Sequence, residues 1–277
     1  MQRDYGVSSI VLCKMGDKFM NWEKELNIAK KAAIEAGKAI MAIYCSEELD
    51  VTYKEDQSPL TRADRQANQI IVEMLSREFP GYAILSEEGK DNKERLENDY
   101  CFVVDPLDGT KEFIKRNGQF TVNIALAYKN EAVMGVIYVP VSGELYWASE
   151  KSGAYLTTHE NTQRICVSER KEDIRVVMSS SHGCREMDDL IEKNHLTNYV
   201  KIGSSLKGCI VAKGDAEIYY RFNPTMEWDT AAMQCIVEEA GAVFRQMDDT
   251  EMRYNRVNCR NDKGFYIVNC PENKMIW

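Results

Sequence analysis

The sequence predicts an α/β layered (α+β) sandwich, in which sheets and helices stack on one another. Apolar residues recur at helical spacing in two long segments between residues 21 and 79. Residues 121–156 instead alternate apolar and polar positions between short turns, which is typical of an antiparallel sheet. Beyond residue 173 short strands and helices alternate, which indicates a second α/β layer packed against the first sheet.

The composition is that of a globular protein with one large domain or two small ones. The chain has 277 residues, of which 44% are hydrophobic and 29% are charged. Its net charge of −9 offers no basic surface for DNA or RNA polymers, which are therefore not expected partners. No apolar run approaches the roughly 18 residues of a spanning helix, and residues 7–13 do not resemble a secretory signal. We expect a cytoplasmic protein, without excluding peripheral association with a membrane.

The cysteines and histidines argue against two kinds of site. Nine scattered cysteines without a Cys-x-x-Cys pair favour neither a disulfide framework nor a zinc site. Only three histidines are present, so a histidine-rich metal centre is excluded.

The N-terminal half is expected to contain two helices and the first strands of a sheet. Residues 1–19 lack periodicity and form an extension, after which a helix begins near Asn21, a residue type that caps helices. The elements that follow are a strand over 51–54, a turn over 56–61, a helix ending at Pro80-Gly81, a strand over 82–85 and a charged surface loop over 90–99.

The rest of the chain is expected to change from hairpins to alternating strands and helices. Hairpin strands are predicted over 121–128, 132–139, 144–148 and 153–156, and the polar stretch 157–173 is the predicted boundary. Beyond it we expect strands over 174–178, 199–202, 217–222, 242–245 and 264–268, and helices over 185–193, 204–212 and 228–240.

One loop has an evident chemical use. The apolar strand over 100–104 ends in Asp105 and Asp108, with Pro106 and Gly109 giving the connection a stiff, compact geometry. Carboxylates in such a place can hold a hard cation, and free backbone N–H groups at a following helix can receive a phosphate. The alternative is an ordinary strand-to-turn connection that uses Asp and Gly as turn formers.

Further carboxylates lie at comparable positions. Glu87 and Glu88 follow the strand over 82–85, and Asp229 opens the helix over 228–240. Taken singly, the glutamates fit a solvated loop and Asp229 fits a helix N-cap. Together, carboxylates at the ends of buried strands repel one another unless cations neutralise them. All-oxygen ligation without histidine suits Mg²⁺.

Three motifs in order make the chain resemble a known superfamily. It resembles the lithium-sensitive, Mg²⁺-dependent phosphatases that include inositol monophosphatase and fructose-1,6-bisphosphatase, from about residue 21 to the C-terminus. The motifs are Glu87-Glu88, Asp105-Pro106-Leu107-Asp108-Gly109-Thr110 and Trp228-Asp229-Thr230-Ala231-Ala232. The resemblance implies an inositol-monophosphatase-like αβαβα fold.

The resemblance also implies roles for individual residues. Two or three Mg²⁺ ions would be held by Glu87, Asp105, the Leu107 carbonyl, Asp108 and Asp229. Asp64 of the Thr61–Asp64 segment would pair with Thr110 to activate water, and the Gly109 and Thr110 amides would receive phosphate oxygens. The substrate site would therefore contain Glu87, Leu107, Asp108, Gly109, Thr110 and Asp229.

Within the superfamily, the stretch 108–113 resembles the 3′(2′),5′-bisphosphate nucleotidases of the CysQ type. Such enzymes convert 3′-phosphoadenosine 5′-phosphate into AMP and phosphate, which supports sulfur assimilation. Cationic and polar groups would hold the nucleotide and its 5′-phosphate, and the candidates are His182, Ser204, Lys207 and Arg221.

The resulting hypothesis is a Mg²⁺-dependent, lithium-inhibited nucleotidase that acts as a monomer or homodimer on a small phosphorylated nucleotide. The alternatives are an inositol monophosphatase or related sugar-phosphate phosphatase, and a catalytically idle metal- or nucleotide-binding protein. The chain would divide into an extension over 1–19, a metal-binding α+β subdomain over 20–165 and an α/β subdomain over 166–277.

Overall fold

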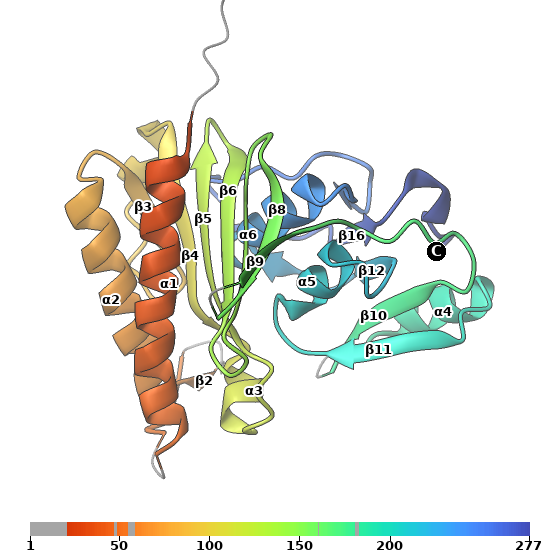
Figure 1. Cartoon of the computed structure of the whole chain (residues 1–277), viewed down its shortest axis with the longest axis horizontal. Coiled ribbons are helices and arrows are strands. Elements are labelled where there is room, and N and C mark those ends of the chain that lie inside the picture. The colour runs from red at the N-terminus through yellow and green to blue at the C-terminus, as the bar shows by residue number, and fades with distance from the viewer. Residues whose placement is uncertain (1–20, 47–48, 55–58, 160, 181–182) are drawn as a thin grey trace, which may run out of the picture.

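The protein is built from five alternating layers, α-β-α-β-α, as Figure 1 shows. This computed structural model describes residues 21–46, 49–54, 59–159, 161–180 and 183–277. The layered α/β fold predicted from the sequence is confirmed. Among the described helices, none is both long and apolar enough to cross a membrane.

Helices α1 (Glu23–Tyr44) and α2 (Arg62–Glu78) form the first layer, on one face of a large sheet (Figure 1). The side chain of Asn21 accepts a hydrogen bond from the Glu23 amide at 2.9 Å, so it satisfies a free N–H group at the start of α1, as expected. A row of buried alanines on α1 lets the two helices approach each other closely.

The second layer is a seven-stranded sheet that runs in chain order, β3-β4-β5-β6-β7-β8-β9. Strands β3 and β4 are parallel and the other pairs are antiparallel, as the predicted hairpins require. The strands are β3 (Ala83–Ser86), β4 (Tyr100–Asp108), β5 (Thr121–Tyr128), β6 (Glu131–Val139), β7 (Glu144–Ser149), β8 (Gly153–Thr158) and β9 (Asn161–Ile165). A small ribbon of β1 (Thr52–Tyr53) and β2 (Pro59–Leu60) and the short helix α3 (Thr110–Ile114) complete this half.

Helices α5 (Leu206–Ala212) and α6 (Glu227–Glu239) form the middle layer and contact both sheets. Gly135 of β6 permits a very close approach, because a Cβ placed there would lie 2.4 Å from the Ala232 carbonyl oxygen of α6. The absence of a side chain at Gly135 therefore sets how near the middle of α6 lies to the sheet.

The fourth layer is a five-stranded mixed sheet with the order β11-β10-β12-β16-β14. Its strands are β10 (Arg175–Ser179), β11 (Asn198–Ile202), β12 (Ile218–Arg221), β14 (Val243–Gln246) and β16 (Phe265–Val268). Helix α4 (Arg185–Lys193) covers its outer face through Met187 and Leu190. A second ribbon pairs β13 (Thr225–Met226) with β15 (Arg260–Asn261), and two 3₁₀ helices are η1 (Lys93–Glu97) and η2 (Pro271–Asn273).

Two local predictions were wrong, and one strand was missed. The charged stretch 90–99 contains η1, and Arg95 is buried, donating hydrogen bonds to Asn255 and to the Arg256 carbonyl. The missed strand is β9 in the polar stretch after residue 157, where only Ile165 is buried, so the strand lacks an apolar pattern. Helix α5 begins at Leu206 rather than residue 204, because Ser204 adopts a left-handed φ of 49°. The division into subdomains stays a prediction.

Replacing the buried Glu217 with glutamine is expected to lower the free energy of unfolding by about 2 kcal/mol at pH 7. Glu217 accepts hydrogen bonds from the Arg175 amide at 2.7 Å and from its guanidinium at 2.6 Å, which ties β10 to β12. Burial raises the pKa of Glu217, but the bonds from Arg175 outweigh it and hold that pKa below the ordinary value. This stabilisation is therefore present at neutral pH and is lost as the pH falls below about 4.

Urea unfolding at pH 7 and at about pH 3 would measure this difference. The matched control is Glu272→Gln, which breaks the exposed ion pair with Lys171 and is expected to leave the free energy of unfolding nearly unchanged. Equal effects of the two substitutions at pH 7 would contradict the structural importance of Glu217.

Candidate active site and metal centre

A cavity of about 250 Å³ opens where the large sheet meets the C-terminal half. Residues from both halves line it, and they include most of the candidates singled out in the sequence. Its lining contains Glu87, Asp108, Gly109, Thr110, Ser204, Ser205, Lys207, Tyr219, Arg221 and Asp229. Asp64, Asp105 and Leu107 are buried beside it rather than forming its wall.

A β-bulge in β4 brings Asp105 and Asp108 to the same side. Residues three apart on a regular strand point to opposite faces of the sheet. Here Asp105 lies opposite Asn123 while Asp108 lies opposite Thr121, so β4 contains one extra residue. The Asp105 side chain also accepts a hydrogen bond from the Leu107 amide at 3.0 Å, which holds the bulge. The bulge thus places the carboxylates of Asp105 and Asp108 on the same side of β4.

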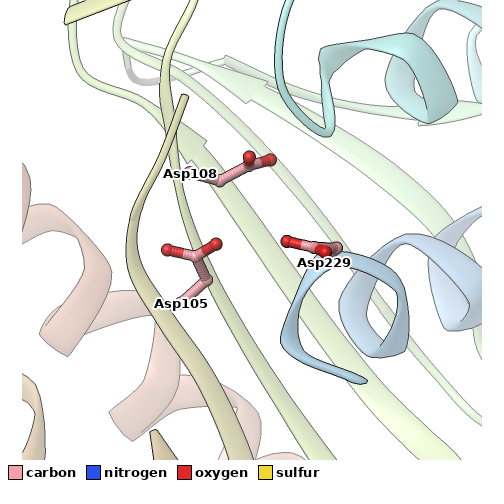
Figure 2. A group of neighbouring side chains, drawn as sticks. All are labelled: Asp105, Asp108 and Asp229. Carbon is pink, nitrogen blue, oxygen red and sulfur yellow. The ribbon is translucent and has the colours of Figure 1, made fainter. Parts of the chain in front are cut away.

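Asp229 reaches these two carboxylates from the first turn of α6. Its side chain accepts a hydrogen bond from the Met226 amide at 2.6 Å, so it also caps the helix. Figure 2 shows the carboxylates of Asp105, Asp108 and Asp229 directed toward one another. One oxygen from each lies within 4.8 Å of the others, a spacing that a shared cation could bridge.

The three carboxylates fit a hard divalent cation. Burial is the largest cause that raises the pKa of all three groups, and neighbouring carboxylates raise the pKa of Asp105 and Asp229 further. The pKa of Asp229 rises to about 7, while the charge of Lys207 opposes the rise at Asp108. A bound cation would offset this repulsion, and all-oxygen donors favour Mg²⁺ or a similar ion.

Glu87 lines the cavity but is not part of this three-carboxylate group. Its carboxylate pairs with the Lys54 ammonium at 2.8 Å, and the same ammonium lies 2.5 Å from Glu88. Burial raises the pKa of Glu87, and Lys54 opposes that rise. The predicted ligand role of Glu87 would require its carboxylate to exchange Lys54 for a metal ion.

Asp64 and Thr110 lie in contact. The Thr110 hydroxyl donates to one Asp64 oxygen at 3.1 Å and lies 3.4 Å from the Leu107 carbonyl. The other Asp64 oxygen accepts hydrogen bonds from the Thr61 amide at 2.7 Å and from its hydroxyl at 2.5 Å. This capping box at the start of α2 fixes the carboxylate of Asp64.

Three of the predicted nucleotide contacts, Ser204, Lys207 and Arg221, line the same cavity as Asp108 and Asp229. Lys207 is buried in the first turn of α5 and donates to the Ser204 carbonyl, and burial lowers its pKa to about 8. The Nε atom of Arg221 is buried without a hydrogen-bond partner among the described residues. His182 lies outside the described residues. The roles of all these residues stay predictions.

The sequence interpretation missed several side chains around the cavity. Thr121, Asn123 and Ser205 form a buried hydrogen-bonded cluster beside Asp108, and Lys54 pairs with Glu87. Thr121 and Asn123 are polar residues at alternate positions of a mostly apolar strand. This pattern was the one feature of the sequence that could have indicated their place beside the site. Nothing in the local sequence of Ser205 pointed to Asp108.

Comparison with known proteins agrees with the motifs. The model of the inositol monophosphatase family matches residues 21–267. A 3′(2′),5′-bisphosphate nucleotidase CysQ of Escherichia coli is 42% identical over 237 residues, which cover 85% of this chain and 96% of that protein. The CysQ of Buchnera aphidicola is 40% identical over 257 residues, covering 88% and 94%.

Solved structures agree as well. CysQ from Bacteroides thetaiotaomicron, described as a bacterial member of the inositol monophosphatase family, superposes with a TM-score of 0.80 at 40% identity and covers 89% of this chain and 97% of that one. An IMPase of Thermotoga maritima superposes with a TM-score of 0.75 at 27% identity, covering 89% and 92%. Motifs, fold and relatives lead to one conclusion, that this chain belongs to the inositol monophosphatase family.

Proposed function

We propose that this protein is a Mg²⁺-dependent phosphatase that removes the 3′-phosphate of 3′-phosphoadenosine 5′-phosphate, giving AMP and phosphate. The observation that carries the proposal is a single cavity whose lining combines Asp108 and Asp229 of the carboxylate cluster with the cations Lys207 and Arg221. Such a cavity has one place for a metal-dependent reaction and a second place for another anionic group. The curated relatives named as nucleotidases of this specificity support the choice of substrate.

The metal would be held by carboxylate and carbonyl oxygens. Two or three Mg²⁺ ions would be shared among Glu87, Asp105, the Leu107 carbonyl, Asp108 and Asp229, and Li⁺ would inhibit by competing for one of these places. When bound, such ions supply a nucleophile from water at neutral pH and stabilise charge on the phosphoryl group. The family is metal-dependent, and the donor set here suits that requirement.

Asp64 and Thr110 would direct the proton of the attacking water. One Asp64 oxygen is held by Thr61, and the other accepts a hydrogen bond from the Thr110 hydroxyl. The Thr110 hydroxyl, donating to Asp64, leaves its own lone pairs to accept a proton from water. As the water oxygen bonds to phosphorus, its proton would pass to Thr110 while the Thr110 proton passes to Asp64. The bond from phosphorus to the ribose 3′-oxygen would break, the ribose oxygen would take a proton from solvent water, and Asp64 would return its proton to solvent.

The remaining groups would bind the nucleotide, a small phosphorylated molecule. The Gly109 and Thr110 amides, which directly follow Asp108 and line the cavity with it, would receive oxygens of the 3′-phosphate. Ser204, Lys207 and Arg221 would hold the 5′-phosphate, and the unpartnered Nε of Arg221 supports this role. His182 would contact the nucleotide near this place.

One comparison of substrates tests the proposal. Phosphate release would be measured for 3′-phosphoadenosine 5′-phosphate, inositol 1-phosphate and fructose 1,6-bisphosphate, each with and without Mg²⁺ and Li⁺. We expect the nucleotide to have the highest kcat/KM, only with Mg²⁺, and to be inhibited by Li⁺. A preference for the inositol ester would favour an inositol monophosphatase, and no release from any substrate would favour an idle binding protein.

Lys207→Ala is expected to raise the KM for the bisphosphate nucleotide about 30-fold, because a buried cation beside the second phosphate is lost. The KM for 3′-AMP, which lacks the 5′-phosphate, should change less than about threefold by the same reasoning. Steady-state kinetics with the two substrates would separate these effects. The matched control is Lys213→Ala directly after α5, where the half-buried side chain pairs with Asp215 outside the cavity. Equal losses for both substrates would remove Lys207 from the 5′-phosphate site.

A further inference from the structure

A buried cluster of three uncharged polar side chains lies beside Asp108. Thr121 and Asn123 extend from β5, and Ser205 immediately precedes α5. All three are almost completely buried, with exposed fractions of 0, 1 and 1%. The Thr121 and Ser205 hydroxyl oxygens are 2.7 Å apart, and the Asn123 side-chain oxygen lies 2.8 Å from the Ser205 hydroxyl and 3.0 Å from that of Thr121.

The hydrogen-bonding capacity of these groups limits the directions that the bonds can take. Each hydroxyl has one proton, and the Asn123 carbonyl oxygen can only accept. A fully satisfied arrangement has Thr121 donating to Ser205, Ser205 donating to Asn123, and the Asn123 amide N–H donating to Asp108 at 3.4 Å. The donors thus form a chain that ends on the carboxylate, and successive bonds in such a chain strengthen one another.

All the hydrogen bonds that described residues make to the Asp108 side chain end on the same oxygen, Oδ2. Besides the Asn123 amide, the Ser205 backbone N–H donates to it at 2.5 Å, and the Thr121 hydroxyl lies 3.5 Å away. No described residue donates a hydrogen bond to the other oxygen, Oδ1, and one oxygen of Asp108 lies within 4.8 Å of an oxygen of Asp105 and of Asp229. The cluster therefore holds Oδ2 in place and sets how the carboxylate plane is turned at the candidate metal site.

We propose that Thr121, Asn123 and Ser205 are positioning residues that preset Asp108 for the cation before substrate binds. The inference rests on the proposed metal role of Asp108. Because β5 belongs to the large sheet and Ser205 immediately precedes α5 of the middle layer, the cluster also ties these two layers together beside the cavity. The three residues touch neither metal nor phosphate; they act through Asp108.

The test measures Mg²⁺ binding without substrate. Isothermal calorimetry with Mg²⁺ would be performed on the wild type, Thr121→Val, Thr121→Ser and Ser205→Ala. Thr121→Val keeps the shape and removes the donor, so we expect a Kd for Mg²⁺ about tenfold higher. Thr121→Ser restores the hydroxyl and should stay within about twofold of the wild type, and Ser205→Ala should match or exceed the loss in Thr121→Val.

Kinetics and a control separate positioning from general stability. In Thr121→Val the Mg²⁺ concentration for half-maximal rate should rise about tenfold while the KM for nucleotide changes less than twofold. The control is Tyr254→Phe, which removes a buried hydroxyl donating to Gln234 at 2.6 Å outside the cavity lining. It should lower the unfolding temperature without changing Mg²⁺ affinity.

Two failures are distinguishable. If the wild type binds no Mg²⁺, the proposed function fails together with this inference. If the wild type binds Mg²⁺ and Thr121→Val binds it equally well, or if Thr121→Ser is as impaired as Thr121→Val, only the positioning role is overturned.

Discussion

Asp108→Asn is expected to reduce phosphate release by at least about 1,000-fold while leaving the protein folded. The substitution keeps the shape and removes one charge from the carboxylate cluster, which is worth several kcal/mol where a cation must be held. The asparagine oxygen can still accept the bond from the Ser205 amide, so the local backbone is retained. Relief of repulsion among buried carboxylates should leave stability without metal equal to that of the wild type or higher.

Thermal unfolding with and without Mg²⁺ would accompany the assay. Wild-type protein should be stabilised by Mg²⁺, because a ligand that binds only the folded state raises its stability, and Asp108→Asn should not respond. Asp262→Asn is the matched control, since it removes an exposed aspartate paired with Arg260. Near-normal turnover in Asp108→Asn would refute the ligand role of this residue.

Asp64→Asn is expected to lower kcat by about 100- to 10,000-fold with little change in Mg²⁺ affinity. The asparagine side-chain oxygen can still accept a hydrogen bond from the Thr61 amide. It is, however, a far weaker acceptor for the proton that Thr110 must release. Thr110→Val should lower kcat by a similar factor, because the hydroxyl that passes the proton to Asp64 is then missing. This separates the pair from Asp108, whose loss removes metal binding itself.

The double variant Asp64→Asn/Thr110→Val provides the sharper test. Residues that act as a unit give non-additive losses, so the double variant should be no more than about threefold slower than the slower single one. Multiplied losses would show that Asp64 and Thr110 act independently. A loss of Mg²⁺ affinity equal to that in Asp108→Asn would assign Asp64 to the metal site instead.

The layered fold and family could be predicted because their signals are local. Helical spacing before residue 80, alternation in β5 to β8 and three short motifs each depend on residues close in sequence, and all were confirmed. Features that depend on contacts between residues far apart in the sequence were missed. Exposed β9 has no apolar pattern, and Arg95 is buried only because Asn255 and the Arg256 carbonyl, far along the chain, accept its protons.

The candidate site shows the same limit. The acidic residues could be named from the sequence, but the bulge that turns Asp105 and Asp108 to one side depends on pairing with β5. The pairing of Lys54 with Glu87 and the cluster at Thr121 depend on contacts between distant segments. Residue identity therefore gave the donors, and only the packed chain gave their orientation.

The place of α6 between the two sheets has a consequence for how the chain reaches its folded state during synthesis. The large sheet is complete at Ile165, but the helix that covers its inner face ends at Glu239, more than 70 residues later. At typical translation rates this delay lasts roughly 4–15 s. Throughout that interval a nascent sheet exposes Ala125, Ile137 and Ala148, residues that belong to the finished core. Nascent chains stalled between residues 165 and 239 are therefore expected to recruit chaperones, and release should follow once α6 has emerged.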